Sequence, residues 1–298
     1  MPHNENSSAT SRLLADILKV PAVQSLVRRV EHGGALSFAG ITASAQPFIA
    51  ALLAQCFPKR PVVIVAENLK QQECFQQDLE TWLVSSAFSV QGSTTLNPEP
   101  QTVNCMFYPA WEILPHEGKL PHTDVISDRL QTLVELSRIT HHASRLVVTS
   151  VTALLQKTFA PSDLKNRAKV LKRGESIAPL DLIEWLEEQG YEPEAQVTQK
   201  GEIALRGGIV DIFPPTSPWP VRLEFFGDEL ESLREFDPQT QVSRGEITEV
   251  TLPPAGEIGI LRQSTSGLSR ITHHASLLDH LPRETIFVLC EPESLAVH

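Results

Sequence analysis

Between residues 201 and 230 the sequence GEIALRGGIVDIFPPTSPWPVRLEFFGDEL alternates apolar and polar side chains at every second position of its first and last runs. Successive side chains of a β-strand point to opposite faces, so this period separates the two faces of a sheet. One face would carry the apolar residues Ile203, Leu205, Val221, Leu223 and Phe225. The pattern predicts adjacent antiparallel strands with one core face and one polar face.

The predicted polar face mixes arginine with an aromatic residue. Arg206, Arg222 and Phe226 fall on it, together with Glu202 and Glu224. Arginine and large aromatic residues are enriched among the residues that anchor protein interfaces. The alternative is an ordinary solvated face of a sheet, where charged residues need no special role. Phe226 would then be covered by a helix. The pattern alone therefore leaves a binding face and an ordinary solvated face as alternatives.

Turn and helix signals complete this second domain. Gly207 and Gly208 permit a bulge or a close approach of the backbone, and the segment PPTSPWP at 214–220 is typical of turns. A helix is expected at 180–189, with Gly190 as its stop, and should pack across the strands to give an α+β domain. A basic segment marks the start of this domain, with Lys165, Arg167, Lys169, Lys172 and Arg173.

The first half of the chain alternates strand and helix signals. Apolar strands are expected at 35–40, 61–67 and 145–150, with a short strand near 106–108 and another at 285–290. One helix follows at 48–57, and a second carries Phe75, Leu79, Trp82 and Leu83 on one face. A third helix is expected at 125–136. This alternation predicts an α/β domain built on a parallel sheet.

The loop between the expected strand at 35–40 and the helix at 48–57 has the context of a phosphate-binding P-loop. A working loop reads Gly-x-x-x-x-Gly-Lys-Ser/Thr, in which backbone N–H groups and lysine bind phosphate and the hydroxyl holds magnesium. Here Gly40 remains, while Ala45, Gln46 and Pro47 replace the second glycine, the lysine and the hydroxyl residue. Glutamine carries no charge and proline neither ligates a metal nor donates an N–H. The loop is therefore expected to be inactive in nucleotide hydrolysis, with no cofactor.

Bulk properties place the chain among globular proteins of two domains. It has 298 residues, 41% of them hydrophobic, and a net charge of −11, which does not favour a wide basic surface for duplex DNA. The four cysteines, Cys56, Cys74, Cys105 and Cys290, form no Cys-x-x-Cys pair, so no zinc site and no disulfide framework is expected. They are expected to be reduced thiols, largely buried. With no signal-peptide or membrane-spanning pattern, the chain is expected to be cytoplasmic.

Two motifs carry a family resemblance. The segments RGGIVDIFPP and VRLEFFGDELESLREFDPQTQ resemble the UvrB-homology module shared by the nucleotide-excision-repair protein UvrB and the bacterial transcription-repair coupling factor, Mfd. The resemblance extends more weakly from about Gly33 to the C-terminus, through FYPAWEILPHE at 107–117 and SDRL at 127–130. It implies a degenerate RecA-like (P-loop-NTPase-like) domain with an inserted α+β domain that binds UvrA. The family's UvrA-binding residues fall on Arg206, Arg222 and Phe226.

The degenerate loop favours the coupling factor over the nucleotide-using UvrB. The implied organisation is a helical lead-in at 1–32, a RecA-like domain at 33–165, an inserted partner-binding domain at 166–250 and a return segment at 251–298. The implied function is a non-catalytic module that recruits UvrA to a stalled RNA polymerase for nucleotide excision repair. RNA polymerase binding, DNA contact and ATP-driven translocation would lie outside these residues.

Two alternatives stay open at this point. One is an ATP-dependent DNA-repair enzyme, and the other is an autoinhibitory module that docks on the protein's own C-terminal translocase and regulatory domains. The chain also repeats the octapeptide SRITHHAS, at 137–144 and 269–276. Neighbouring histidines on a helix point to different sides, so no metal site is expected there.

Overall fold

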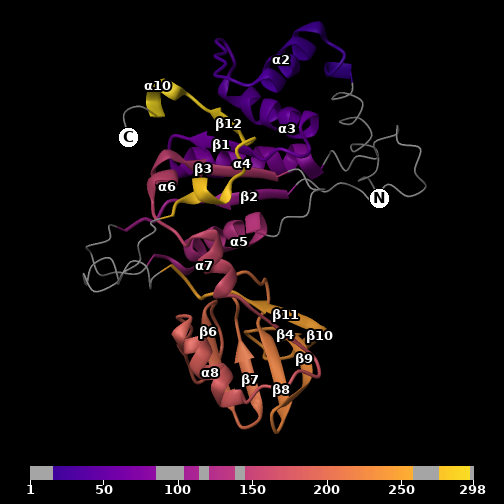
Figure 1. Ribbon diagram of the computed structural model, residues 1–298, viewed down its shortest axis with the longest axis vertical. Coiled ribbons are helices and arrows are strands. Elements are labelled where there is room, and N and C mark those ends of the chain that lie inside the picture. The colour runs from indigo at the N-terminus through magenta and orange to yellow at the C-terminus, as the bar shows by residue number, and fades with distance from the viewer. Residues whose placement is uncertain (1–15, 85–103, 114–120, 138–144, 258–274, 296–298) are drawn as a thin grey trace, which may run out of the picture. The chain divides into compact units, whose positions relative to one another are not determined.

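The computed structural model describes residues 16–84, 104–113, 121–137, 145–257 and 275–295. The chain forms two compact units (Figure 1). Unit 1 comprises Met1–Ala110, Ile139–Leu154 and Leu281–His298, and unit 2 comprises Trp111–Arg138 and Leu155–His280. Both repeats of SRITHHAS lie almost entirely outside the described residues. Among the described residues, no helix combines the length and the apolarity needed to cross a bilayer.

Unit 1 is built on a parallel sheet of four strands. Its strands are β1 (Val62–Ala66), β2 (Asn104–Tyr108), β3 (Arg145–Ser150) and β12 (Ile286–Leu289), in the order β12-β1-β3-β2. Val62 pairs with Ile286 on one side and with Leu146 on the other, so the C-terminal strand completes a sheet begun more than 200 residues earlier. The predicted α/β class and parallel sheet are confirmed.

Two helices cover one face of this sheet. Helices α3 (Gln46–Cys56) and α4 (Leu69–Val84) share a core with alternate strand residues such as Val62 and Ile64. Phe75 and Leu79 of α4 are buried there, as the helical spacing predicted. Unit 1 also contains α2 (Pro21–His32), a 3₁₀ turn η1 (Ala43–Ala45), α10 (Pro292–Leu295) and all but the last residue of α6 (Val151–Leu155).

The strand expected at residues 35–40 is absent, so this prediction was wrong. The described sheet ends at β12 and β2, and residues 35–40 pair with neither. Phe38, its largest apolar residue, is 48% exposed. Without a hydrogen-bonded neighbour, an apolar run has nothing to hold it in a ladder. The helix that follows the loop, α3, does form.

Unit 2 contains a sheet of six strands. They are β5 (Glu192–Pro193), β6 (Glu202–Arg206), β7 (Ile209–Ile212), β8 (Val221–Phe226), β9 (Glu229–Phe236) and β10 (Ser243–Glu246), in the order β10-β9-β8-β7-β6-β5. All neighbours are antiparallel except β5 and β6. A separate antiparallel pair joins β4 (Lys169–Lys172) to β11 (Glu249–Leu252). The helices are α5 (Thr123–Ser137), α7 (Pro161–Asn166), α8 (Pro179–Glu188) and η2 (Leu277–His280).

Helix α8 lies across one face of the six-stranded sheet (Figure 1). Its buried residues Leu182 and Leu186 pack with Ile203, Val210 and Leu223 from three strands. Ile203 and Leu223, together with Val221 and Phe225, occupy the face predicted as the core, whereas Leu205, which was predicted there too, is 37% exposed. Gly190, at φ 87°, follows the end of the helix where the sequence predicted a glycine stop. The other face of the sheet is therefore available for polar residues.

A buried ion pair explains why residues 111–137 belong to unit 2. Arg129 of α5 donates from Nε to Glu257 Oε2 at 2.6 Å, and both side chains are fully buried. Trp111 Nε1 donates to the same oxygen at 2.9 Å, and the Thr158 hydroxyl donates to Glu257 Oε1. Such a pair is tolerated in a core because each charge is compensated. The boundaries expected from the sequence differ, because they group 111–137 with the first domain and divide the chain at 166 and 251.

Candidate functional site

The candidate site is the polar face of the six-stranded sheet, which we call the arginine face and define by Arg206, Asp211, Arg222, Arg234 and Phe226. The strand register aligns these residues. Asp211 of β7 lies opposite Arg222 of β8, which lies opposite Arg234 of β9. The neighbouring row begins with Arg206 of β6, opposite Ile209.

Both predicted arginines meet on a single buried carboxylate. Asp211 has no exposed side-chain surface. Arg222 donates two hydrogen bonds to this carboxylate, with Nε 2.7 Å from Oδ1 and Nη2 2.8 Å from Oδ2. Arg206 Nη2 donates to the same Oδ2 at 2.6 Å. The structure therefore brings Arg206 and Arg222 together, through a residue that the sequence analysis did not single out.

The sequence around Asp211 contains a signal that indicates an ion pair at this position. It is the only polar residue in the strand IVDI of β7. At period two it falls on the side opposite to Val210 and Ile212, which is the side of the two arginines. A lone aspartate within an apolar strand is costly to bury unless cations are close. The pattern therefore indicated an ion pair, although the partners could be assigned only from the register.

The two arginines have different surroundings. The Arg222 side chain is 18% exposed, and its guanidinium lies 4.6 Å from the centre of the Phe236 ring. Its Nη2 also donates to Gln241 Oε1 at 3.3 Å. Hydrogen bonding to Asp211 raises the pKa of Arg222 above its ordinary value, although burial opposes the shift. The Arg206 side chain, in contrast, is 48% exposed.

Phe226, the third predicted residue, is 76% exposed. The residue before it, Phe225, packs with the core on the opposite face, so Phe226 points to the polar side. No helix covers it among the described residues, which disagrees with the ordinary alternative for this aromatic. An exposed phenylalanine next to arginines is the combination found where interfaces are anchored.

A close backbone approach fixes the end of the sheet that carries these residues. The Phe225 N–H donates to the Gly208 carbonyl at 2.8 Å. A Cβ atom on Gly208 would lie 2.9 Å from the Phe225 carbonyl oxygen, so any other residue would force the backbone to shift. The close approach predicted for Gly207 and Gly208 is therefore confirmed at Gly208. It joins the β6–β7 turn to the end of β8, and so sets Arg206 and Phe226 on adjacent segments.

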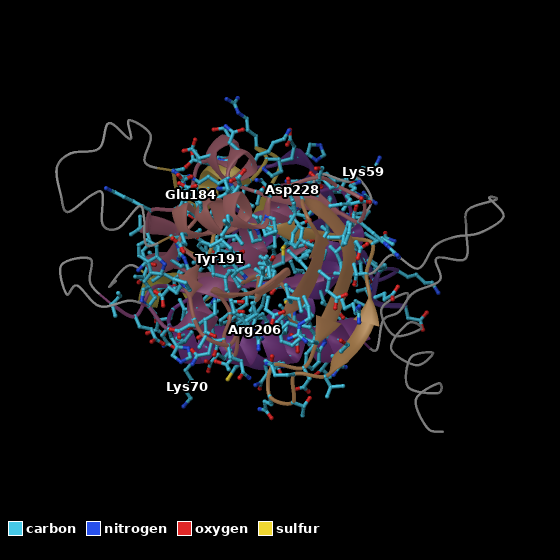
Figure 2. All side chains as sticks on the ribbon, turned by 90° about the horizontal axis from the view of Figure 1, so that it is seen from below. Lys59, Lys70, Glu184, Tyr191, Arg206 and Asp228 are labelled. Atoms are coloured by element: carbon cyan, nitrogen blue, oxygen red, sulfur yellow. The ribbon has the colours of Figure 1, made fainter. Side chains whose placement is uncertain are left out.

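Figure 2 labels Glu184, Tyr191 and Arg206 of unit 2. In this view Tyr191 lies between Arg206 and Glu184, a residue of helix α8. Tyr191 belongs to the core that α8 shares with the strands. The helix and the arginine face therefore lie on opposite sides of the sheet.

The second candidate site is the loop before α3 in unit 1, which the sequence analysis compared with a P-loop, although the strand expected before this loop does not form. Gly40 has φ 78°, and Ala45 precedes helix α3, which begins at Gln46 and carries Pro47 in its first turn. Gln46 Nε2 donates to Glu291 Oε1 at 2.7 Å. A carboxylate thus lies beside Gln46, the residue that stands at the position of the phosphate-binding lysine in the P-loop pattern. Among the described residues, no cluster of three or more His, Cys, Asp or Glu side chains is arranged to hold a metal.

The cysteines partly follow the expectation. All four are free, and Cys290 is buried, but Cys74 is exposed because it lies on the solvent side of α4. Burial raises the pKa of the Cys105 thiol to about 12, and Glu80 adds to this shift. Burial, with a smaller contribution from Glu291, raises the pKa of the Cys290 thiol to about 12.

Comparison with known proteins assigns the unit that carries the arginine face. Residues 170–257 match the family described as the UvrB interaction domain. The chain is 38% identical over 147 residues to the transcription-repair-coupling factor of Escherichia coli, covering 49% of this chain and 12% of that protein. It is 31% identical over 220 residues to the factor of Haemophilus influenzae, covering 62% of this chain and 19% of that protein.

A third relative covers more of the chain. The transcription-repair-coupling factor of Bacillus subtilis is 29% identical over 221 residues, which cover 74% of this chain and 17% of the relative. The match therefore spans less than a fifth of the length of each of these three relatives. Residues 170–257 are a UvrB interaction domain, and the chain is a UvrB-like module related to the transcription-repair-coupling factors.

Proposed function

We propose that this chain is a non-catalytic docking module that binds UvrA through the arginine face. In a coupling factor, this contact would recruit UvrA to a stalled RNA polymerase for nucleotide excision repair. The observation that carries the proposal is the clustering of Arg206, Arg222 and Phe226 on one face of the domain that matches the UvrB interaction family. Unit 1 would be a degenerate RecA-like domain that supports this module.

The chemistry of the arginine face supports a protein partner. Two arginines share one carboxylate, so the three groups together carry an excess of one positive charge. An exposed aromatic ring extends the same face. A cation beside an apolar side chain fits a partner that offers a carboxylate beside an apolar pocket. The acidic net charge of −11 makes duplex DNA a poorer match for this chain.

The contacts of Gln46 support the non-catalytic part of the proposal. Its side chain bonds to Glu291, so a phosphate at the start of α3 would meet a carboxylate. Pro47 brings no N–H to that helix terminus. An ATP-dependent repair enzyme is the competing function. It would require ATP with magnesium to raise the melting temperature of the chain, and we expect no rise.

Calorimetric titration of the chain into UvrA tests the proposal. We expect saturable binding by the wild-type chain and a loss of about 2 kcal/mol or more in Phe226→Ala. Phe287→Ala is the matched control, because Phe287 is an exposed phenylalanine on β12 of unit 1. Equal affinity of the two variants would argue against the arginine face, and no binding by folded wild-type chain would refute the docking function.

A further inference from the structure

We propose that Asp211 is a positioning residue that gives the two arginines different roles. Arg222 is part of the scaffold, and Arg206 is the cation that binds the partner. This inference rests on the proposed docking function. The partner group would be a carboxylate adjacent to an apolar pocket, bound by Arg206 and Phe226 respectively.

Arg222 is held on three sides. Asp211 binds it through a fork, Gln241 accepts a further bond from Nη2, and the Phe236 ring lies beneath the guanidinium. Its side chain is largely covered as a result. Arginine binds a partner carboxylate best through two parallel N–H donors, and the Nε–Nη2 edge of Arg222 is already used. Its contribution to binding is therefore indirect.

Arg206 is held at one point only. Within the part of the chain that the structure describes, its side chain donates a single hydrogen bond, from Nη2 to Asp211 Oδ2. A guanidinium has five N–H donors, so the greater part of this fork still faces solvent. Its side chain is the most exposed of the three arginines on the arginine face, at 48% against 35% for Arg234 and 18% for Arg222.

Arg234, the third arginine, has partners within its own sheet. Its Nη2 donates to Glu224, and its Nε donates to the Ser232 hydroxyl at 3.0 Å. Glu224 therefore balances the charge of Arg234, as Asp211 balances that of Arg222. The positive charge left over on the arginine face is carried by Arg206.

Asp211 connects these observations. Its Oδ2 accepts from both arginines, so the position of Arg222 fixes the carboxylate and the carboxylate restrains Arg206. A half-exposed arginine otherwise samples many rotamers, and fixing it before binding lowers the entropy cost of the complex. Asp211 touches no partner in this arrangement, because it is fully buried. It would act on affinity through Arg206.

A double-mutant cycle separates this role from a purely structural one. Asp211→Asn keeps the shape and removes the charge, and Arg206→Ala removes the cation. We expect each single variant to lose about tenfold or more in affinity for UvrA, measured by calorimetry. In the Arg206→Ala background, Asp211→Asn should cost little further affinity. Additive losses would overturn the inference, because Asp211 would then act independently of Arg206.

A second pair of variants decides the matter if Asp211→Asn does not fold. Arg206→Lys and Arg222→Lys both keep the charge and lose the planar fork. We expect Arg206→Lys to weaken UvrA binding with an unchanged melting temperature. Arg222→Lys should lower the melting temperature and have the smaller effect on the affinity of the folded chain. A larger loss of affinity in Arg222→Lys than in Arg206→Lys, with the lower melting temperature in Arg206→Lys, would overturn the inference.

The tests distinguish this inference from the docking function itself. Binding by the wild-type chain that is weakened by Phe226→Ala, but unchanged by Arg206→Ala, would leave the docking function standing and refute the inference. Absence of binding by the folded wild-type chain would refute both.

Discussion

Arg222 Nε lies 2.7 Å from Oδ1 of Asp211, a carboxylate with no exposed surface, in the facing strand of the same sheet. This pairing places one of the predicted interface arginines partly inside the fold. Reversing the charge at position 222 would set two carboxylates opposite each other on β7 and β8. Such a variant therefore cannot serve as a test of the docking face that leaves the fold intact.

The first prediction concerns the stability of this pair. Arg222→Glu is expected to lower the free energy of unfolding of unit 2 by about 3 kcal/mol or more, because it leaves a buried carboxylate without its main partner. Urea unfolding followed by circular dichroism measures the change. The matched control is Arg173→Glu, since Arg173 is exposed and lies 4.0 Å from Glu246. Similar stability of the two variants would show that the Asp211 pair does not hold the sheet.

The second prediction concerns the turn that abuts β8. Gly208→Ala is expected to cost about 1–3 kcal/mol of stability, because the new Cβ would lie 2.9 Å from a backbone oxygen of Phe225. Gly245→Ala in β10 is the control, as its Cβ would meet no atom within 4 Å. Thermal unfolding of both variants gives the comparison. A Gly208→Ala chain as stable as the control would mean that the turn moves freely away from β8.

The third prediction concerns thiol reactivity. Cys74 is exposed, whereas Cys105 and Cys290 have thiol pKa values raised to about 12 by burial. The thiolate is the reactive form, so these two should be nearly inert at neutral pH. Alkylation of the native chain followed by mass spectrometry should modify Cys74 first. Modification of Cys290 at a comparable rate would contradict the packing of β12.

The fourth prediction is a pH dependence from His280. Burial lowers the pKa of His280 below 6.5, although the Phe159 carbonyl, Asp279 and Glu257 oppose this shift. The unfolded chain then takes up a proton at a higher pH than the folded chain does. The stability contributed by neutral His280 is complete above the unfolded pKa and is lost as the pH falls from there through the folded pKa.

Urea unfolding at several pH values between about 7.5 and 5 measures this effect. His280→Gln keeps a donor near the position of Nε2, which lies 2.7 Å from the Phe159 carbonyl oxygen, and has no titrating group. Its stability should fall less between these pH values than that of the wild-type chain. His122→Gln, at an exposed position, is the control. Equal pH dependence of wild type and His280→Gln would refute the assignment.

Local pattern predicted much of the fold. The period-two alternation correctly separated Leu223 from Arg222, and helical spacing correctly buried Leu79. These predictions succeed because one face of an element must be buried whatever its neighbours are. The prediction of a strand at 35–40 was wrong because a strand also needs a neighbouring strand to hydrogen-bond with. The periodicity of a sequence does not show whether such a neighbour exists.

The site was predicted in part. Arg206, Arg222 and Phe226 do share a face, but whether they bind UvrA is still a prediction. The different surroundings of the two arginines depend on Asp211, whose partners follow from strand register and not from spacing in sequence. The grouping of α5 with unit 2 depends on Glu257, which lies 128 positions from Arg129. Interactions across such distances carry no local signal.

The most direct test of the account is a calorimetric titration of the chain into UvrA, with Arg206→Ala as the variant, Arg173→Ala as its control and circular dichroism to show that all three are folded. The account predicts equal, saturable binding by the wild-type chain and by Arg173→Ala, and binding about tenfold or more weaker in Arg206→Ala. Equal binding by all three folded chains, or none by the wild type, would contradict it.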